Sequence, residues 1–453
     1  MDEKQKKLLI FVAIVLFVLI VGTVVFLIIN KEPKQAVQSN GESNRYPPLT
    51  ENKIELSYWG LWEPNTVMQP IINEFENIYP NIKINYSQQS FTAYEATLYT
   101  RLQQASVGTE PAPDLFRIHN TWTPKFYKYL YPLPQNVMSA QEYSELFYPT
   151  VVSDFTAKDG NIYAIPWYID GLMVFYNKSI FQQAGVEKPP EDWDSFMELA
   201  YKLTKKDVTG RIIQSGLAMG TSRNIRHSRE ILSYLLLLEG VEVMDSARTK
   251  ITLDTPAGQK VFRIYTDFAR GDDAIWSPTL RTDLEMFFAG ELAMMIAPSW
   301  RAFDIIEAAP TVEFDTAPLP QLKENKQNIF YSTYWGDTVS RNTSYPLEAW
   351  AFVKFLSERE QQLNLYSNAS KIRAFGEPYS LVELNSEMEG RAYVSAIAEM
   401  SPFMKSIPIG DEQTVDSAID EAITEIVENG KDISSALKEA EESINNIIRE
   451  TNK

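Results

Sequence analysis

The sequence predicts an α/β fold in which helices cover both faces of a parallel sheet. Strand-like alternation of apolar and polar residues, followed by apolar residues at helical spacing, recurs between residues 54 and 118 and again beyond residue 190. Alternation of strands with helices is typical of parallel sheets built from strand–helix–strand units. With 453 residues, of which 44% are hydrophobic, the chain is long enough for two or three domains with a large core.

The first elements follow one another without long gaps. A strand is predicted near 54–58, because its apolar residues alternate, and a helix follows that Pro80 ends. Residues 82–86 alternate again, and the spacing at 94–105 predicts a second helix. The segment DLFRI at 114–118 is interpreted as the third strand.

The same pattern continues toward the C-terminus. Helices are predicted at 191–205 and 256–270, and LAMMIA at 292–297 is interpreted as a short buried strand. Two apolar stripes, at 415–426 and 433–447, predict two helices at the end of the chain.

The composition narrows the classes of function. The net charge of −18 argues against nucleic acid, because nucleic-acid binding needs basic patches. The chain has no cysteine, which excludes disulfides, thiol catalysis and thiolate metal sites. Its two histidines, His119 and His227, disfavour a histidine-rich metal site or a Ser-His-Asp triad. We therefore expect no metal site, no cofactor and no catalytic residues.

An uncharged apolar run at 8–29 predicts a transmembrane anchor, since a helix of this length crosses a bilayer core of about 30 Å. Three lysines precede it, which places residues 1–7 in the cytoplasm and the rest of the chain outside. A cleaved signal peptide is the alternative, but its apolar region is shorter, about 7–15 residues, and no Ala-x-Ala site follows closely. The polar, proline-containing residues 30–52 predict a flexible linker.

Four segments, in this order, carry a resemblance to a known family. They are IELSYWGLWEPN at 54–65, APDLFRI at 112–118, GNIYAIPWYIDGLMVFYNKSIFQQAGVEKPPEDWDSF at 160–196, and FFAGELAMMIAPSW at 287–300. The chain resembles the family 1 extracellular solute-binding proteins of ABC importers, the group that includes maltose-binding protein, over about residues 53–450. The third segment is the most specific, through its Tyr-Asn-Lys, Pro-Pro and Trp spacing.

The resemblance implies a type II periplasmic-binding-protein-like fold, in which two α/β lobes are joined by crossing strands and separated by a cleft. Lobe 1 would comprise 53–166 and a return segment at 318–371, and lobe 2 would comprise 167–317 and 372–453. The crossings would lie near 166–170, 315–318 and 370–375. Clefts between domains, beyond the carboxyl ends of strands, are favoured ligand sites.

Asp170 is an acidic residue within the apolar run at 165–175. A buried carboxylate is costly unless it is hydrogen-bonded. On the resemblance, Asp170 lies just past the first crossing and faces the cleft, where it would accept hydrogen bonds from ligand hydroxyls. A capping role, or a hydrogen bond between the lobes, is the alternative.

The resemblance also implies a ligand site made of tryptophans and polar residues at strand ends. Tryptophan offers an apolar face to the C–H face of a sugar and also carries a polar N–H. Trp300, in APSWRAF, matches a family position that stacks on sugar. The expected ligand-binding residues are Trp62, Glu63, Asn120, Trp122, Trp167, Asp170, Trp300, Arg301, Tyr334, Trp335 and Arg373.

Structural roles are the alternatives at several of these positions: loop or core packing for the aromatic residues and surface ion pairs for the arginines. Trp193 and Trp350 lie on predicted helices at core spacing and are interpreted as structural. The segment TSRNIRHSR at 221–229 holds three arginines and His227. We interpret it as a solvated helix start, since Ser, Thr and Asn favour caps, rather than as an anion site at the cleft edge.

These features predict a membrane-anchored, extracytoplasmic and monomeric binding component of an ABC transporter, which captures a mono- or oligosaccharide by hinge closure and delivers it to a permease. A non-sugar solute, such as a peptide, polyamine or phosphorylated compound, is an alternative ligand, and a sensor for a signalling partner is an alternative role. A surface glycosidase would need two carboxylates about 5–10 Å apart, and no paired-acid motif is evident. We therefore expect no enzymatic activity.

Overall fold

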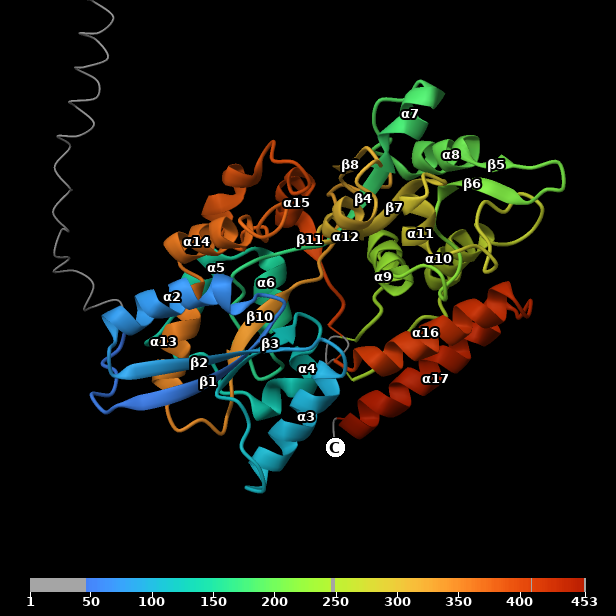
Figure 1. Cartoon of the computed structure of the whole chain (residues 1–453). Helices are drawn as coiled ribbons and strands as arrows, with labels where there is room; N and C mark the ends of the chain where they lie inside the picture. Colours follow the sequence, from blue (N-terminus) through green and yellow to red (C-terminus); the bar gives the residue numbers. More distant parts are fainter. Residues whose placement is uncertain (1–45, 246–248, 409, 452–453) are drawn as a thin grey trace, which may run out of the picture. The chain divides into compact units, whose positions relative to one another are not determined.

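The computed structural model describes residues 46–245, 249–408 and 410–451. Residues 48–453 form one compact unit, which is described by itself (Figure 1). The expected anchor at 8–29, the N-terminal residues 1–7 and most of the linker at 30–52 lie outside the described residues. Within the described ranges, we find no helix that is both long and apolar enough to span a bilayer.

The first lobe is built on a four-stranded sheet of order β10-β3-β1-β2. Its strands are β1 (Ile54–Leu61), β2 (Ile82–Gln89), β3 (Leu115–His119) and β10 (Trp335–Val339). β1 pairs in parallel with β2 and β3, as the alternating pattern predicts, whereas β10 runs antiparallel to β3. Its helices are α2 (Asn65–Ile78), α3 (Tyr94–Ser106), α4 (Thr123–Phe126), α5 (Ala140–Leu146), α6 (Pro149–Phe155), α13 (Pro346–Leu356) and α14 (Arg359–Ala369).

The second lobe contains a five-stranded sheet of order β5-β6-β7-β4-β8. Its strands are β4 (Leu172–Asn177), β5 (Lys205–Lys206), β6 (Ile212–Leu217), β7 (Leu292–Pro298) and β8 (Phe314–Ala317). β6 and β7 are parallel, but β4 runs antiparallel to both β7 and β8. The expectation of a parallel sheet is therefore wrong in part, because both sheets are mixed. β4 and β10 each enter their sheet directly from the hinge rather than through a strand–helix–strand unit, and they run antiparallel to their neighbours.

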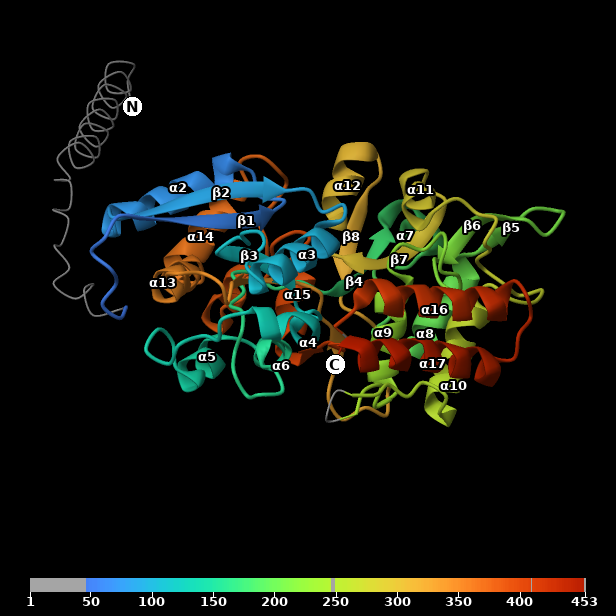
Figure 2. The ribbon, with the colours of Figure 1, turned by 90° about the horizontal axis from the view of Figure 1, so that it is seen from below.

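The helices of the second lobe surround this sheet (Figure 1). They are α7 (Lys178–Ala184), α8 (Trp193–Leu203), α9 (Ser228–Leu238), α10 (Pro256–Asp267), α11 (Asp283–Phe288), α12 (Arg301–Ala308), α16 (Glu412–Val427) and α17 (Ile433–Thr451). The last two lie side by side (Figure 2). The predicted helices at 191–205 and 256–270 and the strand at 292–297 are thus confirmed within a few residues. Trp193 and Trp350 are buried, as expected.

Side-chain caps explain where several of these helices begin. The Asp192 carboxylate accepts the backbone N–H of Ser195 at the start of α8, and Asp411 accepts that of Thr414 at the start of α16. Such a cap satisfies a backbone donor that the first turn of a helix leaves unpaired.

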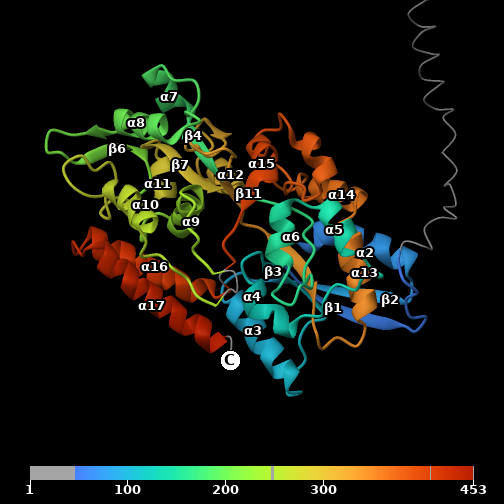
Figure 3. The same ribbon diagram turned by 180° about the vertical axis from the view of Figure 1, so that it is seen from behind.

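Three chain segments cross between the lobes side by side. Gly171 bridges Ser332, and the short strands β9 (Phe330–Tyr331) and β11 (Met404–Lys405) pair in parallel. Figure 3 shows β11 at the junction of the lobes. A Cβ atom on Gly171 would lie 2.3 Å from the Tyr331 carbonyl oxygen, so the first crossing can approach the second this closely only without a side chain.

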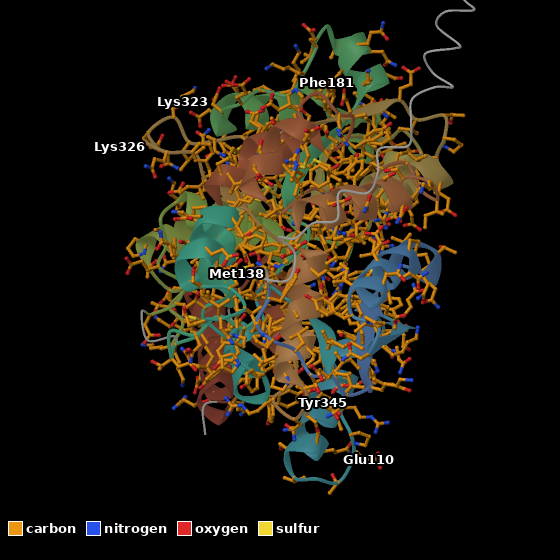
Figure 4. All side chains as sticks on the ribbon, turned by 90° about the vertical axis from the view of Figure 1, so that its left-hand side faces the viewer. Glu110, Met138, Phe181, Lys323, Lys326 and Tyr345 are labelled. Carbon is orange, nitrogen blue, oxygen red and sulfur yellow. The ribbon has the colours of Figure 1, made fainter. Side chains whose placement is uncertain are left out.

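The second and third crossings differ from the positions expected from the sequence. Residues 318–329 stay with the second lobe, since the Gln321 backbone N–H donates to the Glu191 carbonyl oxygen (2.8 Å) and Lys323 pairs with Asp192 (3.0 Å). Figure 4 accordingly shows Lys323 and Lys326 in the same part of the view as Phe181, away from Glu110 and Tyr345.

The segment after α14 also differs from the predicted boundary at 372. Tyr379 bridges Tyr168, Leu381 bridges Phe147, and the Gln362 amide donates to the Ser380 hydroxyl (2.9 Å). These contacts hold 379–401, including α15 (Ser395–Met400), against the first lobe. The third crossing is therefore near 404–408. Periodicity could not locate it, because periodicity records which side of an element is buried and not which lobe the element packs against.

Candidate functional site

A cavity of about 600 Å³ lies beside the hinge and is lined by residues of both lobes. Its volume is in the range of small-molecule sites. The lining residues of the first lobe form one wall of the cavity, and those of the second lobe form the opposite wall. The surface between the two walls, which includes residues of the crossing segments, is called the floor. The residues of these three surfaces include Trp62, Phe91, His119, Tyr168, Asp170, Arg226, His227, Trp300, Arg301, Trp335, Arg373 and Glu377.

The wall of the first lobe is aromatic. The ring centroids of Trp62 and Trp335 are 4.9 Å apart, and those of Trp62 and Phe91 are 5.7 Å apart. Trp62 follows β1 with a φ of 60°, which is unusual for a bulky residue, and its side chain is 42% exposed. Phe91 follows β2 and is 59% exposed. The ends of adjacent parallel strands thus present rings to one cavity.

The wall of the second lobe carries Trp300, between β7 and α12. Its side chain is 38% exposed. The Arg301 guanidinium lies over the indole with its Cζ atom 3.9 Å from the ring centroid. Arg301 also donates to His227 Nε2 (3.0 Å) and to Asp304 Oδ2 (2.7 Å). Trp300 therefore keeps exposed surface on this wall, whereas Arg301 is engaged within the protein.

Asp170 lines the floor and is almost fully buried. Its Oδ1 accepts the backbone N–H of Gly171 (2.8 Å), and its Oδ2 accepts the hydroxyl of Ser299 (2.9 Å) in the second lobe. Burial, with a further contribution from Glu377, raises the pKa of Asp170 to about 8. The two interpretations of Asp170 thus coexist in the structure: it links the crossing to the second lobe, and it faces the cavity.

Arg373 and Glu377 complete the floor. Arg373 Nη2 lies 2.8 Å from Glu63 Oε1 and 3.1 Å from Glu377 Oε1. Burial raises the pKa of Glu377, and Glu63 adds to this shift, although Arg373 opposes it. The floor therefore contains more carboxyl groups than cations among its described residues.

The edge of the cavity holds a contact between the lobes. The Thr121 hydroxyl and the Trp122 indole N–H donate to the Glu412 carboxylate (2.8 and 2.9 Å), and His119 Nδ1 lies 2.8 Å from it. Burial opposes ionisation of Glu412, but His119 and these donors outweigh it and lower its pKa to about 2. Burial likewise opposes the charge on His119, but Glu412 raises the pKa of that imidazole.

Six of the expected ligand-binding residues line the cavity: Trp62, Asp170, Trp300, Arg301, Trp335 and Arg373. Five do not line it: Glu63, Asn120, Trp122, Trp167 and Tyr334. All five are buried.

The five buried residues have structural partners instead. The Asn120 amide and the Tyr334 hydroxyl donate to Asp154 (2.9 and 2.8 Å). Trp167 lies under the guanidinium of Arg117, whose Cζ atom is 4.3 Å from its ring centroid. Glu63, Asn120 and Trp122 were expected in the site because they follow strand ends, whereas Trp167 was expected from its place before Asp170 and Tyr334 from the segment that returns through the first lobe. In the structure, Trp122 bonds to Glu412 of the second lobe and Glu63 pairs with Arg373, and none of the five lines the cavity.

Some cavity residues were not expected. Phe91 had a usable signal, since it follows a predicted strand just as Trp62 does. Glu377 had none, because its position depends on the fold of the segment after α14.

The interpretation of 221–229 as a solvated helix start is only partly right. α9 does begin at Ser228, but His227 is buried and lines the cavity, and so does Arg226. No cluster of three or more His, Asp or Glu side chains suited to a metal ion occurs among the described residues.

The model of the bacterial extracellular solute-binding protein family matches residues 60–363 of this chain. The chain belongs to that family. Because the match covers more than half of the 453 residues, it confirms the family inferred from the four motifs. The family and the fold are those of substrate-binding proteins rather than of enzymes.

The similarity extends to curated and solved members. The chain is 22% identical to the multiple sugar-binding protein of Streptococcus mutans over 334 residues, 70% of this chain and 74% of that one. It superposes on a Listeria monocytogenes ABC substrate-binding protein in complex with cycloalternan with a TM-score of 0.68 at 21% identity, covering 88% and 100% of the two chains. A cyclo/maltodextrin-binding protein complexed with maltotetraose gives a TM-score of 0.72 at 16% identity, covering 89% and 99%. These superpositions establish the two-lobe fold.

Proposed function

We propose that this solute-binding protein captures a mono- or oligosaccharide in the cavity between its lobes. The observation that carries the proposal is the pair of aromatic walls: Trp62, Phe91 and Trp335 on one lobe and Trp300 on the other line the same space. Sugar rings have apolar C–H faces that pack on such rings, and hydroxyl rims that need polar partners. The similar proteins include a multiple sugar-binding protein and proteins complexed with cycloalternan and maltotetraose, and these ligands support this class.

Capture would proceed by hinge closure. A ligand that touches both walls has more contacts in the closed form, so it shifts the population toward that form. The three crossings, with Gly171 packed against Ser332, are the segments about which the lobes would turn. Once the cavity is closed, a hydroxyl that matches no partner leaves a buried group unpaired, at a cost of about 1–3 kcal/mol, and this would select among sugars.

The same proposal includes the cellular setting. Residues 8–29 would anchor the protein in the membrane and place the binding lobes outside the cytoplasm. The flexible linker would keep the lobes within reach of a membrane permease, which receives the ligand from the closed form. The protein would act as a monomer and would not bind nucleic acid, given its net charge of −18.

The test is calorimetry of the full-length protein, held in a detergent without a sugar headgroup, against a panel of sugars. We expect a carbohydrate to bind with one site per chain. Binding of a peptide, polyamine or phosphorylated compound, with no carbohydrate bound, would instead establish the alternative ligand class. Prolonged incubation should leave the bound oligosaccharide intact, and cleavage would show that the protein is an enzyme.

A further inference from the structure

The Trp300 indole has one face covered by the protein itself. The Arg301 guanidinium stacks on it, and the His227 ring meets it edge-on, with 5.8 Å between centroids and an interplanar angle of 80°. Arg301 therefore packs on one face of Trp300, and both residues line the cavity. The orientation of Trp300 depends on whatever fixes Arg301.

Two neighbours fix the guanidinium. Its Nη1 donates to Asp304 Oδ2 (2.7 Å), and its Nε donates to His227 Nε2 (3.0 Å). Only 13% of the Arg301 side chain is exposed, so solvent contributes little to holding it. Without the bond to His227, Arg301 would be tied only to Asp304, which lies one turn further along α12.

The geometry determines the protonation state of His227. A guanidinium has donors and no acceptor, so His227 Nε2 must accept with its lone pair. The imidazole is then neutral and carries its proton on Nδ1, which donates to Glu230 Oε1 at 3.1 Å. These contacts connect Glu230 on α9, through His227 and Arg301, to Trp300 at the cavity.

We propose that His227 is a positioning residue for ligand binding: its neutral, Nδ1-protonated form holds Arg301 against Trp300, and its protonation releases this support. A proton on Nε2 would remove the acceptor and place two cations about 3 Å apart, which is repulsive at short range. The inference rests on the proposed function and adds a pH dependence to it. Binding should weaken as the pH falls.

Several charged groups surround His227, and among them Asp283 also attracts the charge on Arg301. The charged groups that face His227 from its own loop, α9, α11 and α12 are Arg226, Arg229, Glu230, Asp283, Arg301 and Asp304. On α16, Asp416 pairs with Arg229 (2.8 Å) and Glu412 contacts His119. A proton on Nε2 would displace Arg301, because both groups would then be donors at that position.

The chain provides a matched control, because it contains only two histidines, and both line the cavity. His119 bonds to Thr333 and Glu412 and has no contact with Arg301. His227→Gln keeps a neutral side chain that can accept and donate but does not titrate. His119→Gln removes the other imidazole and leaves His227 in place.

The first experiment measures the Kd of a bound sugar at about pH 7.5 and about pH 5 for the full-length wild type and both variants. Loss of a hydrogen bond to a charged group predicts about tenfold weaker binding at the lower pH for the wild type and for His119→Gln. For His227→Gln, the ratio of the two Kd values should fall toward one, and any dependence that remains belongs to the other cavity-lining titratable groups, such as His119 and Asp170. An unchanged pH dependence in His227→Gln, or its loss in His119→Gln, would overturn the inference.

A second experiment needs no ligand. Long-range ¹H–¹⁵N spectra of the side chains, assigned with the two variants, report which nitrogen of His227 carries the proton. We expect Nδ1–H at neutral pH, and a proton found on Nε2 would refute the inference whether or not sugars bind. If the proton is found on Nδ1 but no sugar of the panel binds, the proposed ligand class is wrong, whereas the inference that His227 holds Arg301 against Trp300 still stands.

Discussion

Trp300→Ala tests the cavity directly, because it removes the aromatic wall of the second lobe and leaves the hinge intact. Trp300 lies between β7 and α12, with Arg301 stacked on one face. Its 38% exposure describes the surface that a ligand can still cover. The substitution should therefore weaken binding, and because the larger part of Trp300 is buried in the protein it should also lower the stability of the ligand-free form.

The magnitude follows from that exposed surface. If a tryptophan offers about 250 Å², 38% of it is about 95 Å², and at about 25 cal/mol per Å² this is worth about 2.4 kcal/mol. A sugar that covers half of the available surface would gain about 1.2 kcal/mol. Because about 1.4 kcal/mol is a factor of ten, we expect Kd to rise between about eightfold and about fiftyfold.

Calorimetry with the best sugar of the panel gives both Kd and stoichiometry. Tyr201→Ala is the matched control, since Tyr201 is 42% exposed on α8 and does not line the cavity. It should leave Kd unchanged within about twofold. If Trp300→Ala binds as tightly as Tyr201→Ala, the sugar does not rest on Trp300, and the assignment of the two aromatic walls to the ligand fails.

Three further substitutions test the hinge, the floor and the core. Gly171→Ala should destabilise the protein by about 1–3 kcal/mol in denaturant unfolding, because its Cβ would meet the Tyr331 carbonyl oxygen; unchanged stability would show that the crossings are not packed this closely. The pKa of Asp170 is raised to about 8 in the folded protein, against about 3.9 in the unfolded chain, so its ionisation destabilises the folded state as the pH rises between these values. The Tm of Asp170→Asn minus that of the wild type should therefore increase from about pH 4 to pH 8. A difference that stays constant over this range would contradict the assignment. Arg117→Met should cost about 3–5 kcal/mol, because it leaves the buried Asp337 carboxylate without its cation (3.5 Å), and adding Asp337→Asn should recover part of that loss; no recovery would mean that the pair is not the cause.

Local patterns located most of the elements. Alternation at 54–58 and 82–86 corresponds to β1 and β2, the segment DLFRI at 114–118 corresponds to β3, and the helical spacing at 191–205 corresponds to α8. These predictions succeed because periodicity records which side of an element is buried. Strand direction is not recorded in this way. A strand such as β4 has the same buried side chains whether it runs parallel or antiparallel to its neighbour, so the mixed sheets were not foreseen.

For the candidate site, the sequence indicates which residues lie at strand ends, but it does not indicate which way their side chains point. Trp62, Trp300 and Trp335 follow or begin strands, and all three line the cavity. Asn120 and Trp122 also follow a strand, but Asp154 and Glu412 accept their hydrogen bonds and turn them away from it. A strand end brings a residue to the edge of a sheet, whereas its partners across the fold decide which way it points.

The sequence by itself determined the family, the two α/β lobes and the presence of aromatic residues at strand ends. Motif order and burial patterns depend only on residues that are close together in the sequence. Only the tertiary structure decided where the second and third crossings lie, which tryptophans face the cavity, and that His227 is bonded to Arg301. Those features join residues far apart in the chain, 74 positions in the case of His227 and Arg301. Distance and hydrogen-bond direction between such residues are set by the packing of whole elements, which no local pattern of side chains specifies.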